Sequence, residues 1–288
     1  METTTTPMIT PTRTSSAGRS PNGQLLNGQR GELSLTLARR GGRSALTRRY
    51  ASAPFGSVRA AYPDGSGIPE LQVTNPSGGI LGGDHLRMEI VLRPGAAATV
   101  LTQGAAKAYR GPESCHEAAF SLGEGTFLEY LPHHLIPYAG SRHRLRTEFR
   151  LRKSSALLAW ESVSAGRLAR GERFAFDRLS SRTRLCVDGR PEAADGFELS
   201  GGDEHFGGYS YLGTVLAWVP EGEKALAEKL QQTAQGNSIL ASASAPCAGL
   251  CVVRILSTNA EALYSTLNPI RDRVRDFLGL PLAPRDVR

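Results

Sequence analysis

The sequence is poor in cysteine, in aromatic residues and in long apolar runs. It has four cysteines in 288 residues, and they are unevenly spaced, so a disulfide framework is excluded. No stretch approaches the roughly 18 consecutive apolar residues that a membrane span needs. Aromatic residues make up only 7% of the chain, whereas glycine (32) and proline (17) are plentiful, which favours strands and turns over a helical bundle. These features predict a globular protein of the reducing cytoplasm, with no membrane association.

Residues 1–22 are also short of apolar side chains. This segment is rich in threonine, serine and proline, and it lacks the apolar core of a secretory signal. A segment with so little to bury stays disordered. The sequence therefore predicts a disordered N-terminal tail over residues 1–22 and one β-rich domain over residues 23–288.

Lysine is scarce as well, because only four of the 34 basic residues are lysine and the rest are arginine. The formal net charge is +7, and residues 141–190 alone hold 13 basic and 5 acidic residues. Such a block is typical of a nucleic-acid groove or of a docking face for an acidic protein. An arginine bias with abundant alanine and glycine is also what a GC-rich genome produces, and we favour this compositional explanation.

Alternation of apolar and polar residues indicates strands along most of the chain. Leu33, Leu35 and Leu37 show the period of two that a half-buried strand requires. Strands are likewise predicted in residues 44–51, 86–92, 100–102, 120–122 and 127–131. In residues 144–152 apolar residues alternate with a row of arginines, so one face is expected to be buried and the other to face water. Asp188-Gly189 predicts a hairpin turn, and the lack of a sequence repeat argues against a propeller or a solenoid.

Two helices are expected, both near the C-terminus. Residues 222–235 are helix formers, with Leu226 and Leu230 on one face. Asn259 is expected to cap a second helix, which Pro269 should kink or restart. The fold class predicted is therefore mainly β, or α+β by a strict count. It consists of stacked β-sheets in a single domain with about two C-terminal helices.

The densest motif is NPSGGILGGD at residues 75–84. It has no G-K-[ST] element and a strand follows it, so a phosphate-binding loop is not supported. We expect tight turns at which backbones approach closely. Asp84 ends the motif, where a carboxylate is placed for coordination or for a buried hydrogen bond. Lys107, in the motif TQGAAKAYR at residues 102–110, is its expected ion-pair partner.

The second dense motif runs from Trp160 to Glu172. Glu161 follows an apolar run, and a buried carboxylate needs a cation or hydrogen-bond donors. Arg167 and Arg170 are near enough in sequence to supply them. An acid/base pair of Glu161 and Glu172 is the alternative. The residues alone thus leave open a small β-rich hydrolase using these two carboxylates, or an arginine-rich nucleic-acid-binding module.

Two pairs of metal-type ligands give only weak signals. His133 and His134 are adjacent, and adjacent side chains on a strand point to opposite faces. Cys247 and Cys251 have no second cysteine pair with which to complete a zinc site. A stable zinc site is not expected, and the roles of these four residues stay open.

Taken in order, the motifs resemble those of the UreD (also UreH) family of urease accessory proteins. The resemblance begins with NPSGGILGGD and TQGAAKAYR and continues through LEYLP at residues 128–132 and IPYAGS at residues 136–141. It ends with Trp160-Glu161 and with GRLARGE at residues 166–172. The likeness covers roughly residues 30–280.

The resemblance implies both a function and a fold. UreD-like proteins are cytoplasmic chaperones rather than enzymes. They bind urease apoprotein (UreA, UreB and UreC), UreF and the GTPase UreG, and this assembly delivers Ni²⁺ to the dinickel site of urease. The family fold has stacked sheets with about two helices.

The resemblance also implies an internal, water-filled passage for nickel, lined partly by acidic residues. By motif position, Asp84 and Glu161 are expected to line it, with Lys107 close by. Arg167 and Glu172 are expected to be structural or to lie next to the passage. No tightly bound cofactor is expected, only transient Ni²⁺.

Overall fold

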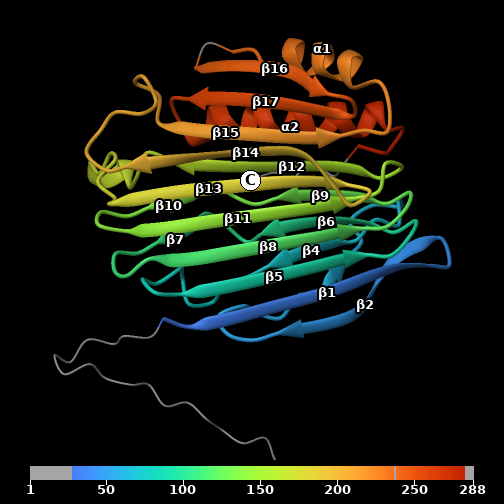
Figure 1. Ribbon diagram of the computed structural model, residues 1–288, viewed down its shortest axis with the longest axis horizontal. Coiled ribbons are helices and arrows are strands. Elements are labelled where there is room, and N and C mark those ends of the chain that lie inside the picture. Colours follow the sequence, from blue (N-terminus) through green and yellow to red (C-terminus); the bar gives the residue numbers. More distant parts are fainter. Residues whose placement is uncertain (1–27, 237, 283–288) are drawn as a thin grey trace, which may run out of the picture.

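Two β-sheets stacked face to face and two helices make up the described part of the protein (Figure 1). The computed structural model describes residues 28–236 and 238–282. The disordered tail predicted over residues 1–22 lies outside the described residues. The mainly β fold class, with stacked sheets and two C-terminal helices, is confirmed.

The first sheet has seven strands. In spatial order these are β14 (Arg190–Ser200), β13 (Arg178–Val187), β11 (Arg142–Leu151), β8 (Ser114–Leu122), β5 (His85–Leu92), β1 (Arg30–Arg40) and β2 (Arg43–Ala51). The second sheet has ten strands, of which β10 (Leu135–Pro137) and β7 (Ala106–Ala108) branch off beside β12. The other eight are, in order, β16 (Ile239–Cys247), β17 (Leu250–Ser257), β15 (Tyr211–Trp218), β12 (Ala156–Ser164), β9 (Phe127–Leu131), β6 (Ala97–Thr102), β4 (Glu70–Val73) and β3 (Ala60–Ala61).

Most of the central strands are parallel because the chain alternates between the two sheets. It passes in turn through β4, β5, β6, β8, β9, β11, β12 and β13, and each pass adds a strand to one sheet or the other. In the second sheet these strands begin at nearly constant intervals, at Glu70, Ala97, Phe127 and Ala156. The chain thus winds as a two-sided coil, the solenoid-like arrangement that the lack of a sequence repeat argued against. The backbone path repeats here although the side chains that hold each turn do not.

The layer between the sheets is apolar, as the alternating pattern predicts. Leu33, Leu35 and Leu37 of β1 are buried. Phe120 of β8 stacks on Phe149 of β11, with ring centroids 4.9 Å apart. Each large apolar side chain contributes roughly 1.5–3 kcal/mol when it is fully buried. This layer is therefore the main source of the stability of the fold.

The arginine row of β11 lies on the outer face of the seven-stranded sheet, as predicted. Most of its members form surface ion pairs: Arg144–Glu113, Arg146–Glu117 and Arg150–Glu148. Exposed ion pairs contribute only about 0–1 kcal/mol each. Their carboxylates offset much of the positive charge on this face, which weakens the case for a nucleic-acid groove.

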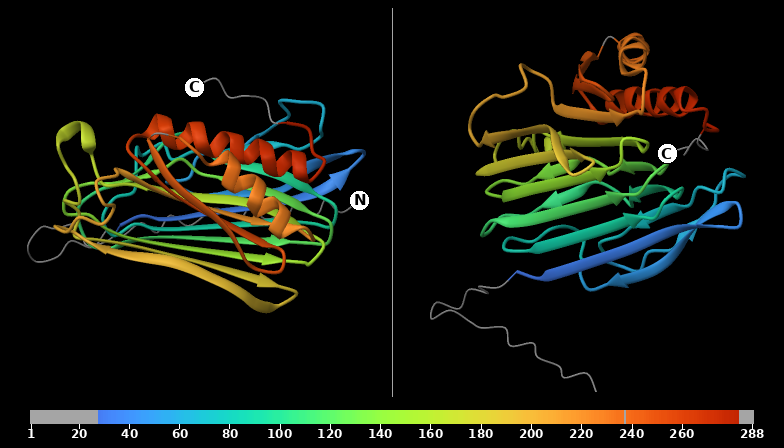
Figure 2. Two further views of the ribbon diagram at one scale, coloured as in Figure 1. Left: turned by 90° about the horizontal axis from the view of Figure 1, so that it is seen from above. Right: turned by 45° about the vertical axis from the view of Figure 1, so that its right-hand side comes forward.

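Two helices cover the outer face of the ten-stranded sheet, over the C-terminal strands β15, β16 and β17 (Figure 2). They are α1 (Glu223–Thr233) and α2 (Ala260–Phe277). The side chains that they bury against the sheet include Leu226, Leu230, Leu263, Leu267, Ile270 and Val274. Asn259 caps α2 as predicted, because its Oδ1 accepts a hydrogen bond of 2.8 Å from the backbone N–H of Ala262. No helix in the described ranges is both long and apolar enough to cross a membrane.

Helix α2 continues through Pro269 without a break, so of the two predicted outcomes, a kink or a restart, the restart is wrong. A proline in an unsupported helix interior costs about 3 kcal/mol. Here the turn that follows is held to the sheet by Ile270 and Val274, which are buried. Arg271 and Arg275, on the same part of the helix, bind a buried carboxylate. These tertiary contacts outweigh the loss of one backbone hydrogen bond.

That carboxylate is Glu129, which lies in the middle of β9 and is fully buried beneath α2. It accepts hydrogen bonds from Arg271 Nε at 3.0 Å and from Arg275 Nη1 at 2.7 Å. Arg271 Nη2 and the hydroxyl of Thr99 donate two more, at 2.8 Å and 2.6 Å. The Arg271 and Arg275 side chains are only 12% and 2% exposed. Helix α2 is thus joined to the sheet through a buried ionic cluster.

Candidate functional site

The glycines of residues 75–84 let two segments of backbone come close together. A Cβ on Gly79 would lie 2.7 Å from the carbonyl oxygen of Lys107, and one on Gly82 would lie 2.6 Å from Cα of Gly111. Real Cβ atoms essentially never approach backbone so closely, and only glycine fits at both positions. The close backbone approach predicted from this motif is confirmed.

Asp84 fastens the end of this loop with two hydrogen bonds from the backbone. Its Oδ1 accepts from the N–H of Gln29 and its Oδ2 from the N–H of Leu81, both at 2.8 Å. The residue is 1% exposed. In the described ranges Asp84 has no ion pair with Lys107, so the predicted pair is wrong and backbone N–H groups satisfy the carboxylate instead. Asp84 also does not line the cavity described below.

We expect Asp84→Asn to destabilise the fold by about 1–3 kcal/mol, the cost of a buried N–H group without an acceptor. An amide offers one acceptor oxygen and turns a donor toward the second N–H group. Chemical unfolding of the variant and the wild type measures the difference. Asp203→Asn, at an exposed position, is the matched control and should change nothing. Equal stability of Asp84→Asn and wild type would contradict this role.

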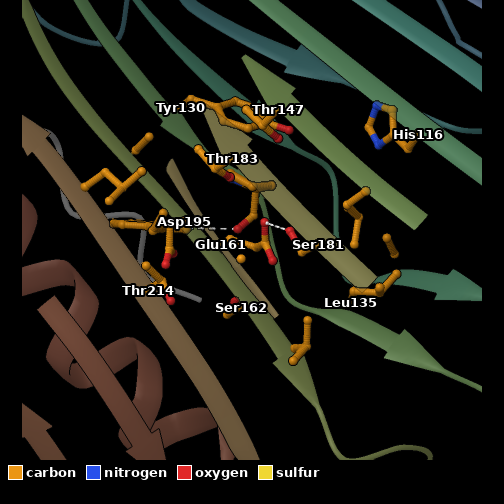
Figure 3. Close-up of a pocket in the computed structure, with 18 of the residues that line it drawn as sticks. His116, Tyr130, Leu135, Thr147, Glu161, Ser162, Ser181, Thr183, Asp195 and Thr214 are labelled. Carbon is orange, nitrogen blue, oxygen red and sulfur yellow. Dashed lines mark hydrogen bonds between the residues drawn. The ribbon is translucent and has the colours of Figure 1, made fainter. Parts of the chain in front are cut away.

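A cavity of about 90 Å³ lies between the two sheets (Figure 3). Its walls are largely apolar. The polar or ionisable side chains among its lining residues include His116, Thr147, Glu161, Ser181, Thr183, Asp195 and Thr214. One water molecule needs roughly 10–15 Å³ of such space. The cavity therefore has room for several waters or for a hydrated cation that has lost part of its shell.

Glu161 projects into this cavity from the middle of β12. Because side chains alternate along a strand, it shares the inward face with Leu157, Ala159 and Val163, all of them buried. Across the gap, the hydroxyl of Ser181 in β13 donates a hydrogen bond of 2.6 Å to Glu161 Oε2 (Figure 3). The carboxylate thus links the two sheets from an otherwise apolar face.

The pKa of Glu161 is raised to about 7, chiefly because burial disfavours the charged form and also because the Asp195 carboxylate is near. The Ser181 hydroxyl and the Arg254 guanidinium lower the pKa of Glu161, but by less. The pKa of Tyr130, which also lines the cavity, is raised by burial and by Glu161. Near neutral pH, Glu161 therefore gains or loses a proton readily.

Arg167 and Glu172 form an ion pair with each other, in the loop that holds the short helix η1 (Leu168–Arg170). Arg167 Nε donates to Glu172 Oε2 at 2.8 Å, and neither residue lines the cavity. The predicted contact between Glu161 and Arg167 is wrong, because β12 carries Glu161 into the interior and ends at Ser164, before the arginine. Arg170 is exposed. Glu161 and Glu172 do not share a site, so the hydrolase alternative loses its acid/base pair.

The family model for the UreD urease accessory protein matches this chain over residues 29–288. The chain belongs to the UreD family. The motifs that suggested the family thus lie in a matching region that covers the cavity and all of the described strands and helices. The resemblance stated from the sequence is confirmed.

Curated relatives agree with the UreD assignment. The urease accessory protein UreD of Cenarchaeum symbiosum (strain A) is 36% identical over 212 residues, which are 69% of this chain and 74% of the relative. UreD of Alkalilimnicola ehrlichii is 33% identical over 268 residues, 89% of this chain and 90% of the relative. UreD of Pseudomonas putida (strain W619) is 33% identical over 262 residues, with 88% and 91% covered. These relatives are all named urease accessory proteins.

Two histidines of this UreD chain for which the sequence predicted no role lie between the sheets. They are His116 of β8, which lines the cavity, and His143 of β11. Burial lowers the pKa of His116 to about 4 and the pKa of His143 to about 3, so both are neutral near pH 7. Within the described residues, the Nε2 atom of each is buried without a hydrogen-bond partner. In the sequence, both histidines stand among alternating apolar residues, and this pattern could have indicated that they are buried.

His133 and His134 have separate partners. His134 Nδ1 lies 3.1 Å from the hydroxyl of Tyr264, and His133 Nδ1 lies 3.2 Å from Thr102 Oγ1. The pKa of His134 is lowered to about 4, mainly by burial. Across the described ranges, no group of three or more histidine, cysteine, aspartate or glutamate side chains is arranged to hold a metal ion. The side chains around the cavity that could ligate a metal ion are therefore scattered.

Cys247 and Cys251 are free thiols at the turn between β16 and β17. Cys251 Sγ donates a hydrogen bond of 2.9 Å to the carbonyl oxygen of Glu223. Burial raises the pKa of Cys251 to about 12, and it also raises the pKa of Cys247. Both thiols stay protonated near pH 7, the form that does not ligate metals.

Proposed function

We propose that this protein assists the delivery of Ni²⁺ to urease. In this proposal it binds UreF, the GTPase UreG and urease apoprotein (UreA, UreB and UreC) in the cytoplasm, and it acts as a chaperone rather than as an enzyme. Membership of the UreD family supports the role in urease maturation. The observation that supports passage of the ion is Glu161, a carboxylate with a pKa near neutrality that faces a cavity between the sheets.

The ligands around the cavity suit an ion that must leave again. A closed site of four protein ligands holds a metal tightly. Here Glu161 and Asp195 are the two carboxylates among the described lining residues, and His116 and the exposed His133 are the two imidazoles. Carboxylate and imidazole are acceptable ligands for Ni²⁺. With so few of them, water would complete the coordination shell, and binding would be weak enough for release.

Proton exchange at Glu161 gives a second reason for weak, reversible binding. Because the pKa of Glu161 is about 7, the side chain is partly protonated at neutral pH. A cation binds the deprotonated form, so entry of Ni²⁺ displaces the proton. When the ion leaves, the proton returns and the interior is neutral again. The empty cavity therefore avoids the full cost of a buried charge.

We expect a strain that lacks this protein to make urease that is poor in nickel and inactive. The measurement is the nickel content of urease purified from cells grown at limiting nickel, with and without a plasmid that restores the chain. Restoration of nickel by the plasmid, and capture of UreF and UreG with the tagged chain, would support the proposal. Normal nickel content and activity in the deletion strain would overturn it.

A further inference from the structure

One row of polar side chains crosses the inner face of the ten-stranded sheet. In the antiparallel register, Glu161 of β12 pairs with Thr214 of β15, and Thr214 pairs with Arg254 of β17. Neighbours in such a row have their side chains on one face of the sheet. The row therefore leads from Glu161 inside the cavity to Arg254, which is exposed.

The outer end of this row lies at an edge of the molecule. Strand β14 is the last strand of the seven-stranded sheet, whereas the ten-stranded sheet continues beyond β15 with β17 and β16 (Figure 1). Asp195 and Gly196 of β14 line the cavity, and Gly196 is exposed. The wall of the cavity at this edge is thus the single strand β14, and Arg254 of β17, which does not itself line the cavity, contacts Asp195 there.

Arg254 and Asp195 form an ion pair across this edge, from β17 of one sheet to β14 of the other. Arg254 Nη1 also donates a hydrogen bond of 2.7 Å to Thr214 Oγ1. The Arg254 side chain is 45% exposed and that of Asp195 is 26% exposed. An exposed pair contributes little to stability, so the guanidinium can turn into solvent at small cost. An arginine stays protonated, and only such a movement removes its charge from the Asp195 carboxylate.

We propose that Asp195 and Arg254 form a gate, in which the guanidinium occupies the place that a divalent cation takes when it passes between solvent and Glu161. The Asp195 carboxylate binds the guanidinium when the gate is closed, and it binds the cation when the gate is open. The two positive charges repel each other and compete for the same carboxylate. The buried Nε2 of His116, on another wall of the cavity, has no hydrogen-bond partner among the described residues and supplies an additional ligand further along. This inference rests on the proposed function for the identity of the cation as Ni²⁺.

The test is the binding of Ni²⁺ alone to the purified full-length protein, measured by equilibrium dialysis at pH 8. Removing a nearby positive charge should strengthen binding at the carboxylates, because a charge in contact shifts the affinity for another ion by about tenfold or more. We expect Arg254→Gln to lower the Kd about tenfold and Asp195→Asn to raise it. Arg254→Lys keeps the charge and should remain close to the wild type.

Two further variants show where the ion binds. Adding Glu161→Gln to Arg254→Gln should abolish the gain in affinity, because the ion then lacks its inner ligand. Arg178→Gln is the matched control: Arg178 of β13 also pairs with a carboxylate of β14, that of Glu198, but neither residue lines the cavity. An unchanged Kd in Arg254→Gln, or a gain that survives Glu161→Gln, would overturn the gate. Because this assay contains no urease, its outcome is independent of whether the deletion strain loses nickel.

Discussion

Glu129→Gln is expected to lower the free energy of unfolding by about 3–5 kcal/mol, as is typical when one partner of a buried ion pair is removed. The substitution keeps the size of the side chain but leaves Arg271 and Arg275 without their shared carboxylate. Their next nearest carboxylates are Glu70, 3.9 Å from Arg271, and Asp64, 4.0 Å from Arg275. Both contacts are longer than those to Glu129 and compensate only in part. Helix α2 should therefore lose much of its attachment to the sheet.

Thermal and chemical unfolding measure this effect. For a chain of this size, 1 kcal/mol corresponds to roughly 2–4 °C in Tm, so a fall of about ten degrees is expected. Glu148→Gln is the matched control, because Glu148 forms an exposed pair with Arg150 and should contribute only about 0–1 kcal/mol. A Glu129→Gln variant as stable as Glu148→Gln would show that the buried cluster does not hold α2.

Glu161→Gln is expected to stabilise the protein above pH 7 and to leave its stability unchanged near pH 5. The pKa of Glu161 is raised from an ordinary value of 4.5 to about 7 in the folded state. Between these values the folded state holds the proton more tightly than the unfolded chain, so stability falls as the pH rises. Above pH 7 the ionised carboxylate costs on the order of 1–3 kcal/mol, and glutamine removes that cost.

The measurement is the difference in Tm between Glu161→Gln and the wild type from pH 5 to pH 8. Glu172→Gln is the control with the opposite sign. The pKa of Glu172 is lowered by its hydrogen bond with Arg167, so this carboxylate contributes stability above its unfolded pKa and loses it as the pH falls. Glu172→Gln should therefore be the less stable variant at pH 8. A Glu161→Gln variant that is destabilised at pH 8 would show that the charged form of Glu161 is the one the fold favours.

Much of the fold could be predicted from the sequence because burial imposes local patterns. The period-two leucines of β1, the arginine row of β11 and the Asn259 cap depend on neighbours within a few residues. The coiled path of the chain could not be predicted in this way. It arises from the pairing of strands far apart in sequence, and no repeated motif marks it.

The candidate site was predicted in part. Glu161 faces a cavity between the sheets, but its partners lie on other strands: Ser181 is 20 residues away in the chain. Asp84 is held by Gln29, 55 residues away, and not by the lysine that the motif order suggested. Only the strand register brings such pairs together. Glu129 did leave a signal, since a charged residue inside an apolar strand requires a partner such as the Arg271 and Arg275 pair on α2.

The most direct test of the central claim is the nickel content of urease matured with Glu161→Gln in place of the wild type. The amount of complex captured with UreF and UreG is measured in the same cells, so that a loss of assembly is recognised. If Ni²⁺ passes Glu161, we expect nickel per urease to fall about tenfold at equal complex, because the amide lacks the charge that attracts the cation. Glu172→Gln should leave nickel loading intact. Wild-type nickel content in urease matured with Glu161→Gln, at equal complex, would contradict the account.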